Sequence, residues 1–311
     1  MKNIIAFAVG LALVGALPVA PAMALAGRTF VSPTGSDSNP CSLALPCRNL
    51  QAALNQTNPG GEISILGTAG YSGGATLTID RAISIVNPGA FEAGISPPSG
   101  GTGIVINAGT TDAVSLRGLT IEGAGVGHTG IQFNSGKSLT IENCVIRHLT
   151  NEGIDFFPNA ASRLSVSNSV MSDNNIAGIF VQPSGSGAVA AVFNRVQANG
   201  NSFYGILVDG SYSSGTTKAS VYDSVAAGNA VGFYASNSGT LMLFHSVAAD
   251  NDSSGLQASG SGAILRIAQS MVTGNSSGWY TNNGGVVQSY GDNYINGNVG
   301  NETGPPPVAL K

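Results

Sequence analysis

Charged side chains are scarce in this chain, at 9% of the residues against about 25% in an ordinary soluble domain. The scarcity excludes a helical bundle or a coiled coil, because exposed helix faces need Lys and Glu. No run of Lys or Arg occurs, and the net charge is −4. The sequence therefore predicts neither nucleic acid nor an anionic membrane as a partner, since both require a basic surface. Glycine, with 44 residues among 311, is abundant instead.

Long apolar runs are missing after the first segment. There, Lys2 precedes fourteen apolar or glycine residues, 4–17, and the small-residue sites Ala22-Met23-Ala24 and Ala24-Leu25-Ala26 follow. This pattern predicts a secretory signal peptide over residues 1–26, cleaved after Ala24 or Ala26. A retained membrane anchor is the alternative, but the run is shorter than the roughly 17 to 25 residues that span a bilayer. We expect a secreted or periplasmic mature chain without a membrane span.

Cysteine is also rare, with three residues. Cys41 and Cys47 stand in one short segment flanked by turn-forming residues, and in an exported chain we expect them to form a disulfide rather than two free thiols. Cys144 lies within the apolar strand pattern of residues 139–146. We expect it to be a buried or half-buried thiol and not a nucleophile.

A dipeptide of glycine followed by a large apolar residue recurs from residue 130 onward. Its members are Gly130-Ile131, Gly153-Ile154, Gly178-Ile179, Gly205-Ile206, Gly232-Phe233, Gly255-Leu256 and Gly278-Trp279. The steps between them are 23, 25, 27, 27, 23 and 23 residues. A period of this kind predicts stacked structural repeats.

Two further columns of residues follow the same period. One consists of Asn143, Asn168, Asn194, Asp223, His245, Gln269 and Asn293. The other is pure asparagine, at Asn174, Asn199, Asn229, Asn251, Asn275 and Asn298. Amides stacked about 4.8 Å apart can hydrogen-bond to one another and to the turn backbone, so we expect asparagine ladders.

The pattern within each repeat distinguishes a leucine-rich repeat from a stack of β-coils. Short segments rich in Val, Leu and Ser, such as residues 164–167 and 241–244, alternate with Gly, Asn and Ser, and no repeat has a helical stretch. Asn143 also stands two residues after Ile141, where a leucine-rich repeat needs three. We predict coils of three short parallel strands, with the apolar residue after each column glycine pointing inward.

These columns resemble the right-handed parallel β-helix proteins of the pectin-lyase-like superfamily over roughly residues 63–298. The head, residues 28–37 with Cys41 and Pro46-Cys47-Arg48, is similar to exported bacterial β-helix-repeat proteins of mostly unassigned activity. The superfamily includes pectate lyases, polygalacturonases, alginate epimerases and phage tailspikes. The resemblance implies an all-β right-handed parallel β-helix and, by analogy alone, contact with carbohydrate.

The segments of the chain are predicted as follows. Residues 27–62 form an N-terminal cap, in which a short helix over 48–55 covers the opening of the solenoid. Residues 63–300 form the β-helix, with strands at 77–79, 83–85 and 104–106 and a protruding loop from Phe91 to Gly103. Residues 301–311 form a C-terminal tail, because Pro305-Pro306-Pro307 cannot continue a sheet.

Residues that alternate with the inward stack should form two outward columns on one strand face. One column is Gln132, Asp155, Phe180, Leu207, Tyr234, Gln257 and Tyr280, and the other is Asn134, Phe157, Gln182, Asp209, Ser236, Ser259 and Asn282. Aromatic rings, amides and carboxylates suit sugar stacking and hydroxyl hydrogen bonds. The candidate ligand-binding residues are Asp155, Phe157, Phe180, Gln182, Asp209 and Tyr234, against the alternative of a merely solvated sheet.

Catalytic chemistry has weaker support. Asp155 and Asp209 should be roughly 12 Å apart, beyond the about 5 to 9.5 Å that a glycoside hydrolase needs. The column of calcium-binding Asp residues typical of pectate lyases is absent from adjacent repeats. Arg147, His148, Glu152 and Asp155 are the remaining candidates for proton transfer, and surface ion pairs in a turn are the alternative.

No cofactor is expected from the sequence. The His residues have no metal-ligand spacing, and Asp250-Asn251-Asp252 offers too few carboxylates to establish a calcium site. Two functions of different class remain: an exported, non-catalytic scaffold that binds polysaccharide or a cell surface, and a polysaccharide lyase, hydrolase or epimerase. The missing carboxylate column favours the scaffold, and nothing selects the glycan.

Overall fold

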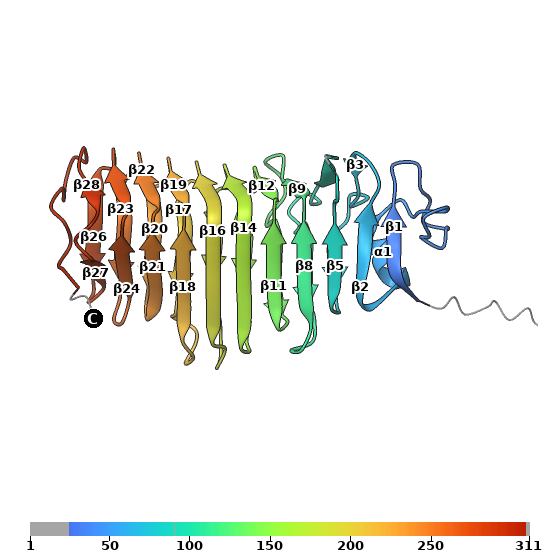
Figure 1. Ribbon diagram of the computed structural model, residues 1–311, viewed down its shortest axis with the longest axis horizontal. Helices are drawn as coiled ribbons and strands as arrows, with labels where there is room; N and C mark the ends of the chain where they lie inside the picture. Colours follow the sequence, from blue (N-terminus) through green and yellow to red (C-terminus); the bar gives the residue numbers. More distant parts are fainter. Residues whose placement is uncertain (1–24, 90, 309–311) are drawn as a thin grey trace, which may run out of the picture.

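The structure, a computed structural model, describes residues 25–89 and 91–308 and is a stack of parallel β-coils with one short helix (Figure 1). The predicted signal peptide lies almost wholly outside the described residues. No described helix is long and apolar enough to span a membrane.

One side of the stack is a sheet of nine parallel strands, here called the platform sheet. Its strands are β4 (Leu77–Ile79), β7 (Ile104–Asn107), β10 (Ile131–Ser135), β13 (Ile154–Phe156), β15 (Ala177–Val181), β17 (Tyr204–Asp209), β20 (Val231–Ser236), β23 (Ser254–Ser259) and β26 (Ser277–Asn282). The strands predicted at 77–79 and 104–106 are confirmed.

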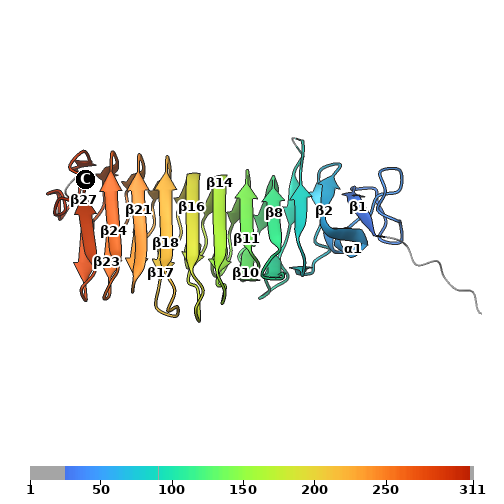
Figure 2. The same cartoon turned by 60° about the horizontal axis from the view of Figure 1, so that its bottom comes forward.

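The other two sides belong to a sheet of 19 strands. The first of them holds β1 (Ala26–Val31), β2 (Thr57–Ile65), β5 (Ile83–Val86), β8 (Ala113–Arg117), β11 (Ser138–Glu142), β14 (Ser162–Ser172), β16 (Val189–Asn199), β18 (Thr217–Tyr222), β21 (Gly239–Phe244), β24 (Ile264–Ala268) and β27 (Val286–Ser289). The second holds β3 (Ala69–Gly70), β6 (Ala93–Ile95), β9 (Leu119–Glu122), β12 (Val145–Arg147), the later halves of β14 and β16, β19 (Val225–Ala227), β22 (Val247–Ala249), β25 (Met271–Thr273) and β28 (Tyr294–Ile295). Figure 2 shows the strands stacked in sequence order along the long axis.

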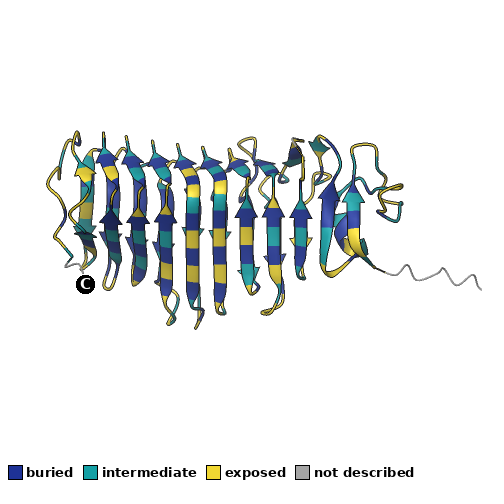
Figure 3. Ribbon diagram, in the orientation of Figure 1, coloured by how far each residue is buried: buried dark blue, intermediate teal, exposed yellow. Residues whose placement is uncertain are grey.

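The predicted inward stack is confirmed. Ile131, Ile154, Ile179, Ile206, Phe233, Leu256 and Trp279 pair in register from coil to coil. All are fully buried except Trp279, which is partly buried in the last coil. Buried and exposed residues alternate along the strands, as the period of two requires (Figure 3). The preceding glycines are needed because a Cβ at Gly178 would lie 2.8 Å from the Gly205 carbonyl oxygen.

A buried asparagine ladder exists, but one of its predicted members is wrong. Asn174, Asn201, Asn229, Asn251 and Asn275 each donate from Nδ2 to the Oδ1 of the ladder asparagine in the next coil at 2.8–3.1 Å, and Asn298 accepts the last of these bonds. Asn201 occupies the place that the sequence assigned to Asn199. The half-buried Asn199 side chain instead accepts the Ala227 N–H at 3.1 Å.

The other predicted column marks a sharp bend between the two sides of the large sheet. Asn143, Asn168, Asp223, His245 and Gln269 have φ between 47° and 54°. The prediction fails at Asn194 and Asn293. Arg195, with φ 53°, takes the bend because Asn194 pairs with Ser167 of the strand before it. Asn293 lies one residue after the bend position, and its Oδ1 accepts the N–H of Ser270, the residue that follows the bend residue Gln269.

Two other boundaries differ from the prediction. The stretch from Phe91 to Gly103 is not a free loop, because β6 within it pairs with β3 and β9. Parallel pairing also begins before residue 63, since β1 pairs with β2 inside the predicted cap segment. At the other end, the Pro306 carbonyl accepts the Ser289 N–H and Val308 donates to the Ser289 carbonyl, so the tail packs on β27.

The helix α1 (Leu50–Gln56) forms where expected, from good helix formers, and buries Leu50, Ala53 and Leu54. It lies at the N-terminal end of the stack (Figure 1). Cys41 and Cys47 form the predicted disulfide. Cys144 is buried, and burial raises the pKa of its thiol to about 11, so it remains protonated.

The first strands of the stack find hydrogen-bond partners in this head segment. The Phe30 N–H donates to the Cys41 carbonyl and its carbonyl accepts the Cys47 N–H. The Gln51 amide accepts the Thr78 N–H at 2.9 Å and faces the Thr78 carbonyl at 3.5 Å, as a neighbouring strand would. Arg48 donates to the Gly70 carbonyl of β3 at 2.7 Å.

Candidate functional site

The outward face of the platform sheet carries the two predicted columns in the predicted register. Asp155 pairs with Phe180, Phe180 with Leu207, and Leu207 with Tyr234. In the next column Asp209 pairs with Ser236, and Ser236 with Ser259. Asp155, Phe157, Phe180, Gln182, Asp209 and Tyr234 therefore share one face. Leu207 is only 5% exposed although its column faces outward.

A third column on this face was missed in the sequence. Tyr204 lies two places before the inward Ile206, and its ring centroid is 5.4 Å from that of Tyr234. Glu152 lies at the corresponding place before Ile154, and Thr129 before Ile131. The signal was available, because each of these residues directly precedes a column glycine. The position was overlooked because it holds no repeated residue type.

The polar residues of this face are held in place by one another. Gln182 donates from Nε2 to Asp155 Oδ1 at 3.2 Å. Asp209 Oδ1 accepts the Ser211 hydroxyl at 2.6 Å and its N–H at 2.9 Å. These bonds fix carboxylate oxygens beside the rings of Phe180 and Tyr234. Such fixed acceptors beside rings are what a sugar hydroxyl requires.

Glu152 has an unusual environment for a carboxyl group. It is only 6% exposed, and its Oε2 accepts Asn151 Nδ2 at 2.7 Å and the Thr129 hydroxyl at 3.4 Å. Burial, and then the negative charge of Asp155, raise the pKa of Glu152 to about 7. Burial also raises the pKa of Asp155, against the hydrogen bond from Gln182 and the nearby His128.

The predicted group of Arg147, His148, Glu152 and Asp155 does not form one cluster. Arg147 Nε and His148 Nδ1 both bind the carboxylate of Glu122, at 2.7 and 2.8 Å. Hydrogen bonds from Ala124, His148 and Arg147 outweigh burial and lower the pKa of Glu122. His148 and Asp173 line an open cavity of about 520 Å³. Arg147 and His148 thus contact Glu122 at the surface and not the Glu152 and Asp155 carboxyl groups.

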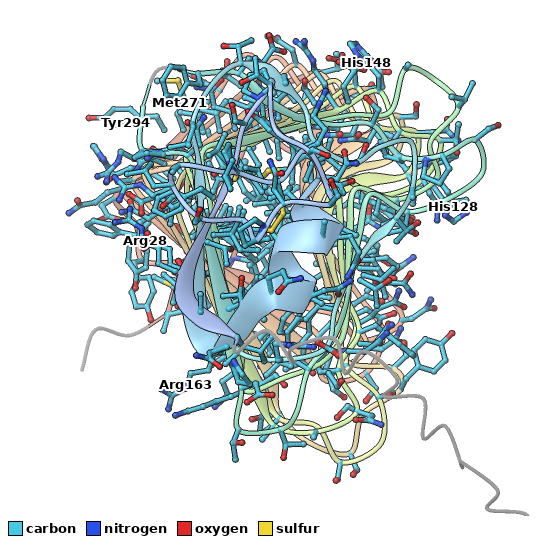
Figure 4. All side chains as sticks on the ribbon, turned by 90° about the vertical axis from the view of Figure 1, so that its right-hand side faces the viewer. Arg28, His128, His148, Arg163, Met271 and Tyr294 are labelled. Carbon is cyan, nitrogen blue, oxygen red and sulfur yellow. A yellow bond between two sulfur atoms is a disulfide. The ribbon has the colours of Figure 1, made fainter. Side chains whose placement is uncertain are left out.

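Figure 4 separates the polar regions around the axis. His128, beside the platform sheet, and His148, on the turn, lie apart, and Arg163 lies on another side again. No group of three or more His, Cys, Asp or Glu residues in the described part of the chain is placed to hold a metal ion. Asn251 of the weak calcium candidate uses its side-chain amide, both as donor and as acceptor, in the asparagine ladder.

Comparison with known families supports the solenoid assignment. Residues 90–218 match a family described as the right handed beta helix region. The chain is a right-handed parallel β-helix. A search of curated proteins gives no match.

Solved structures of the same fold include several enzymes. The pectate lyase Pel9A has a TM-score of 0.66 and 21% identity, over 86% of this chain and 75% of that one. The alginate lyase of Paenibacillus sp. str. FPU-7 has a TM-score of 0.63 and 18% identity, over 91% and 99%. The GH136 lacto-N-biosidase of Eubacterium ramulus has a TM-score of 0.54 and 13% identity, over 91% and 67%. At these identities the β-helix shares their fold, and its function must be argued from its own surface.

Proposed function

We propose that this β-helix is an exported polysaccharide-binding protein and that the glycan lies along the outward face of the platform sheet. The observation that carries the proposal is the alignment on one face of Phe157, Phe180, Tyr204 and Tyr234 with Asp155, Gln182 and Asp209. Rings supply stacking area, and the oriented oxygens and amides select hydroxyl positions. Sugar-acting proteins among the solved structures of this fold are consistent with the proposal.

The test removes rings from this face and, separately, from another. A Phe157→Ala, Phe180→Ala, Tyr234→Ala triple variant should lose affinity for whichever polysaccharide of a neutral and acidic panel binds the parent. The matched control is Tyr222→Ala, Phe244→Ala, Tyr294→Ala, which removes exposed rings from the large sheet. Circular dichroism confirms that both variants remain folded. Unchanged affinity in the first triple variant would reject the platform face as the binding site.

Export is part of the same proposal. The segment over residues 1–26 would direct secretion and be removed after Ala24 or Ala26, leaving a mature chain with the Cys41–Cys47 disulfide. Intact-mass analysis of the secreted protein tests both points. A product that retains residues 1–26, or that reacts with a thiol reagent at both cysteines without reduction, would contradict it.

We also propose that α1 and the disulfide-closed segment cap the N-terminal end of the solenoid. The bonds to Phe30, Gly70 and Thr78 support this role, because each satisfies a backbone group at the free edge of a first strand. A solenoid with uncovered edges would pair with a second copy.

A second candidate function is glycan cleavage, favoured by the paired environments of Glu152 and Asp155. A carboxyl with a pKa of about 7 can donate a proton at neutral pH, while a second carboxylate accepts one. In hydrolysis, Glu152 would protonate the departing glycosidic oxygen as its bond to carbon breaks. Asp155 would take a proton from the water that adds to that carbon. Release of reducing ends by the parent, lost in Glu152→Gln and Asp155→Asn, would establish cleavage over simple binding.

A further inference from the structure

Three cationic residues line a second cavity, away from the platform face. Lys137, Arg163 and Lys218 line an open cavity of about 510 Å³, here called the basic pocket. Its other lining residues are small or uncharged: Ala161, Ser162, Ala188, Val189, Ala190 and Thr216. No carboxylate among the described residues forms a salt bridge with any of the three cations.

The fold, not the local sequence, brings these cations together. Arg163 of β14 pairs with Ala190 of β16, and Ala190 pairs with Lys218 of β18. The Arg163 N–H donates to the Lys137 carbonyl at 3.1 Å, which places Lys137 in the coil before. Cations therefore occupy three of four successive coils, and the methyl group of Ala190 leaves the space between Arg163 and Lys218 open.

An acidic residue of the preceding coil, Asp112, does not neutralise the pocket. The Asp112 carbonyl accepts the Lys137 N–H, but its carboxylate turns away and accepts the Gly109 N–H at 2.9 Å. Arg163 and Lys218 are two coils apart, about 9.6 Å at the usual spacing of parallel strands. Three unpaired cations on a chain of net charge −4 create a local positive field that an anion would stabilise.

We propose that the basic pocket binds the carboxylate or sulfate groups of an acidic polysaccharide. The proposal rests on the polysaccharide-binding function above and names its ligand class. The Arg163 guanidinium can hold two oxygens of one such group, while Lys137 and Lys218 act as point charges on either side. Three cations around one cavity suit a few anionic groups on a chain, whereas a nucleic acid requires a longer basic stripe.

The experiment uses three polymers that share one backbone and differ in charge: dextran, carboxymethyl-dextran and dextran sulfate. The variant is Lys137→Gln, Arg163→Gln, Lys218→Gln. The matched control, Arg117→Gln, Arg195→Gln, Arg266→Gln, removes the same charge outside the pocket. We expect the parent to bind one or both charged dextrans, the pocket variant to bind about tenfold or more weakly, and the control to change less than about threefold.

Several outcomes would overturn the proposal. Equal losses in the pocket variant and the control would show that only overall charge matters. Binding of inorganic sulfate with no binding of either charged dextran would assign the pocket to a free anion. Equally tight binding of a DNA duplex, lost in the pocket variant, would assign it to nucleic acid.

The platform triple variant separates this proposal from the one on which it rests. If the platform triple variant loses glycan binding while the pocket variant binds like the parent, polysaccharide binding is supported and the acidic ligand class is rejected. If no polysaccharide binds the parent, both the polysaccharide-binding function and the acidic ligand of the basic pocket are rejected.

Discussion

At the scale of single residues, two glutamates of adjacent coils show how placement decides ionisation. Glu122 is surrounded by donors from Arg147, His148 and Ala124, which lower its pKa. Glu152 is buried beside Asp155, which raises its pKa to about 7. The sequence identified Glu152 as a candidate but could not show this difference, because it depends on which neighbouring coil faces each carboxyl group.

The two pKa shifts predict opposite effects of pH on stability. Between the ordinary glutamate pKa of 4.5 and the folded pKa of about 7, folded Glu152 holds its proton more tightly than the unfolded chain does, so the free energy of unfolding falls as pH rises. The loss is at most about 3 kcal/mol. Glu152→Gln should match the parent near pH 4 and exceed it near pH 8 in urea titrations.

Glu122→Gln is a control for which we expect the opposite dependence of stability on pH. Because the folded pKa of Glu122 is lowered, its contribution is present at neutral pH and lost as pH falls through the folded pKa. This variant should therefore be less stable than the parent at pH 7. The same pH dependence in parent and Glu152→Gln would contradict the raised pKa.

At the scale of strands, the alternation of inward and outward residues decides the effect of substitution. Ile179 is fully buried between Ile154 and Ile206, whereas Phe180 faces outward. Ile179→Asp should cost several kcal/mol of unfolding free energy, because it buries an unpaired charge. Phe180→Asp should cost far less. Equal losses of thermal stability in the two variants would show that this strand register is wrong.

The asparagine ladder offers a matched pair of substitutions. Asn229 Oδ1 accepts both the N–H and Nδ2 of Asn201, so Asn229→Ala leaves two buried donors unpaired. We expect a loss of about 3 kcal/mol or more in denaturant titration. Asn199→Ala, outside the ladder, should lose about 1 kcal/mol. A larger loss of stability in Asn199→Ala than in Asn229→Ala would contradict the ladder described above.

The same elements show how far the sequence determines the fold. The period and the inward stack were predictable because each repeats one side-chain character in every coil. The two outward columns were predictable because strand residues alternate with the inward stack. Asn199 was mistaken for Asn201 because coil lengths vary and both asparagines fall near the expected step. The strand β6 was missed because its three residues, with a glycine in the middle, are too few to show an alternation. The basic pocket was hidden because its cations lie in separate coils.

At the scale of the whole molecule, we expect the N-terminal edge to control association. Gln51 supplies β4 with both an acceptor and a donor at Thr78. Gln51→Ala should expose this edge and shift the protein toward end-to-end dimers, measurable by sedimentation velocity across a concentration series. Gln56→Ala, at the end of the same helix, is the control. A strictly monomeric Gln51→Ala variant would show that the edge is protected by other means.

The asparagine ladder also determines where this molecule can open. The backbone N–H and the Nδ2 of one ladder asparagine both donate to the Oδ1 of the asparagine in the next coil. Separating two middle coils therefore leaves two buried donors unpaired, whereas a coil at the end of the ladder makes fewer of these bonds. We therefore expect local unfolding to begin at the two ends of the solenoid and not in its central coils. Amide protons around Asn201 and Asn229 should be among the last to exchange with deuterated solvent, and those around Asn298 among the first of the ladder.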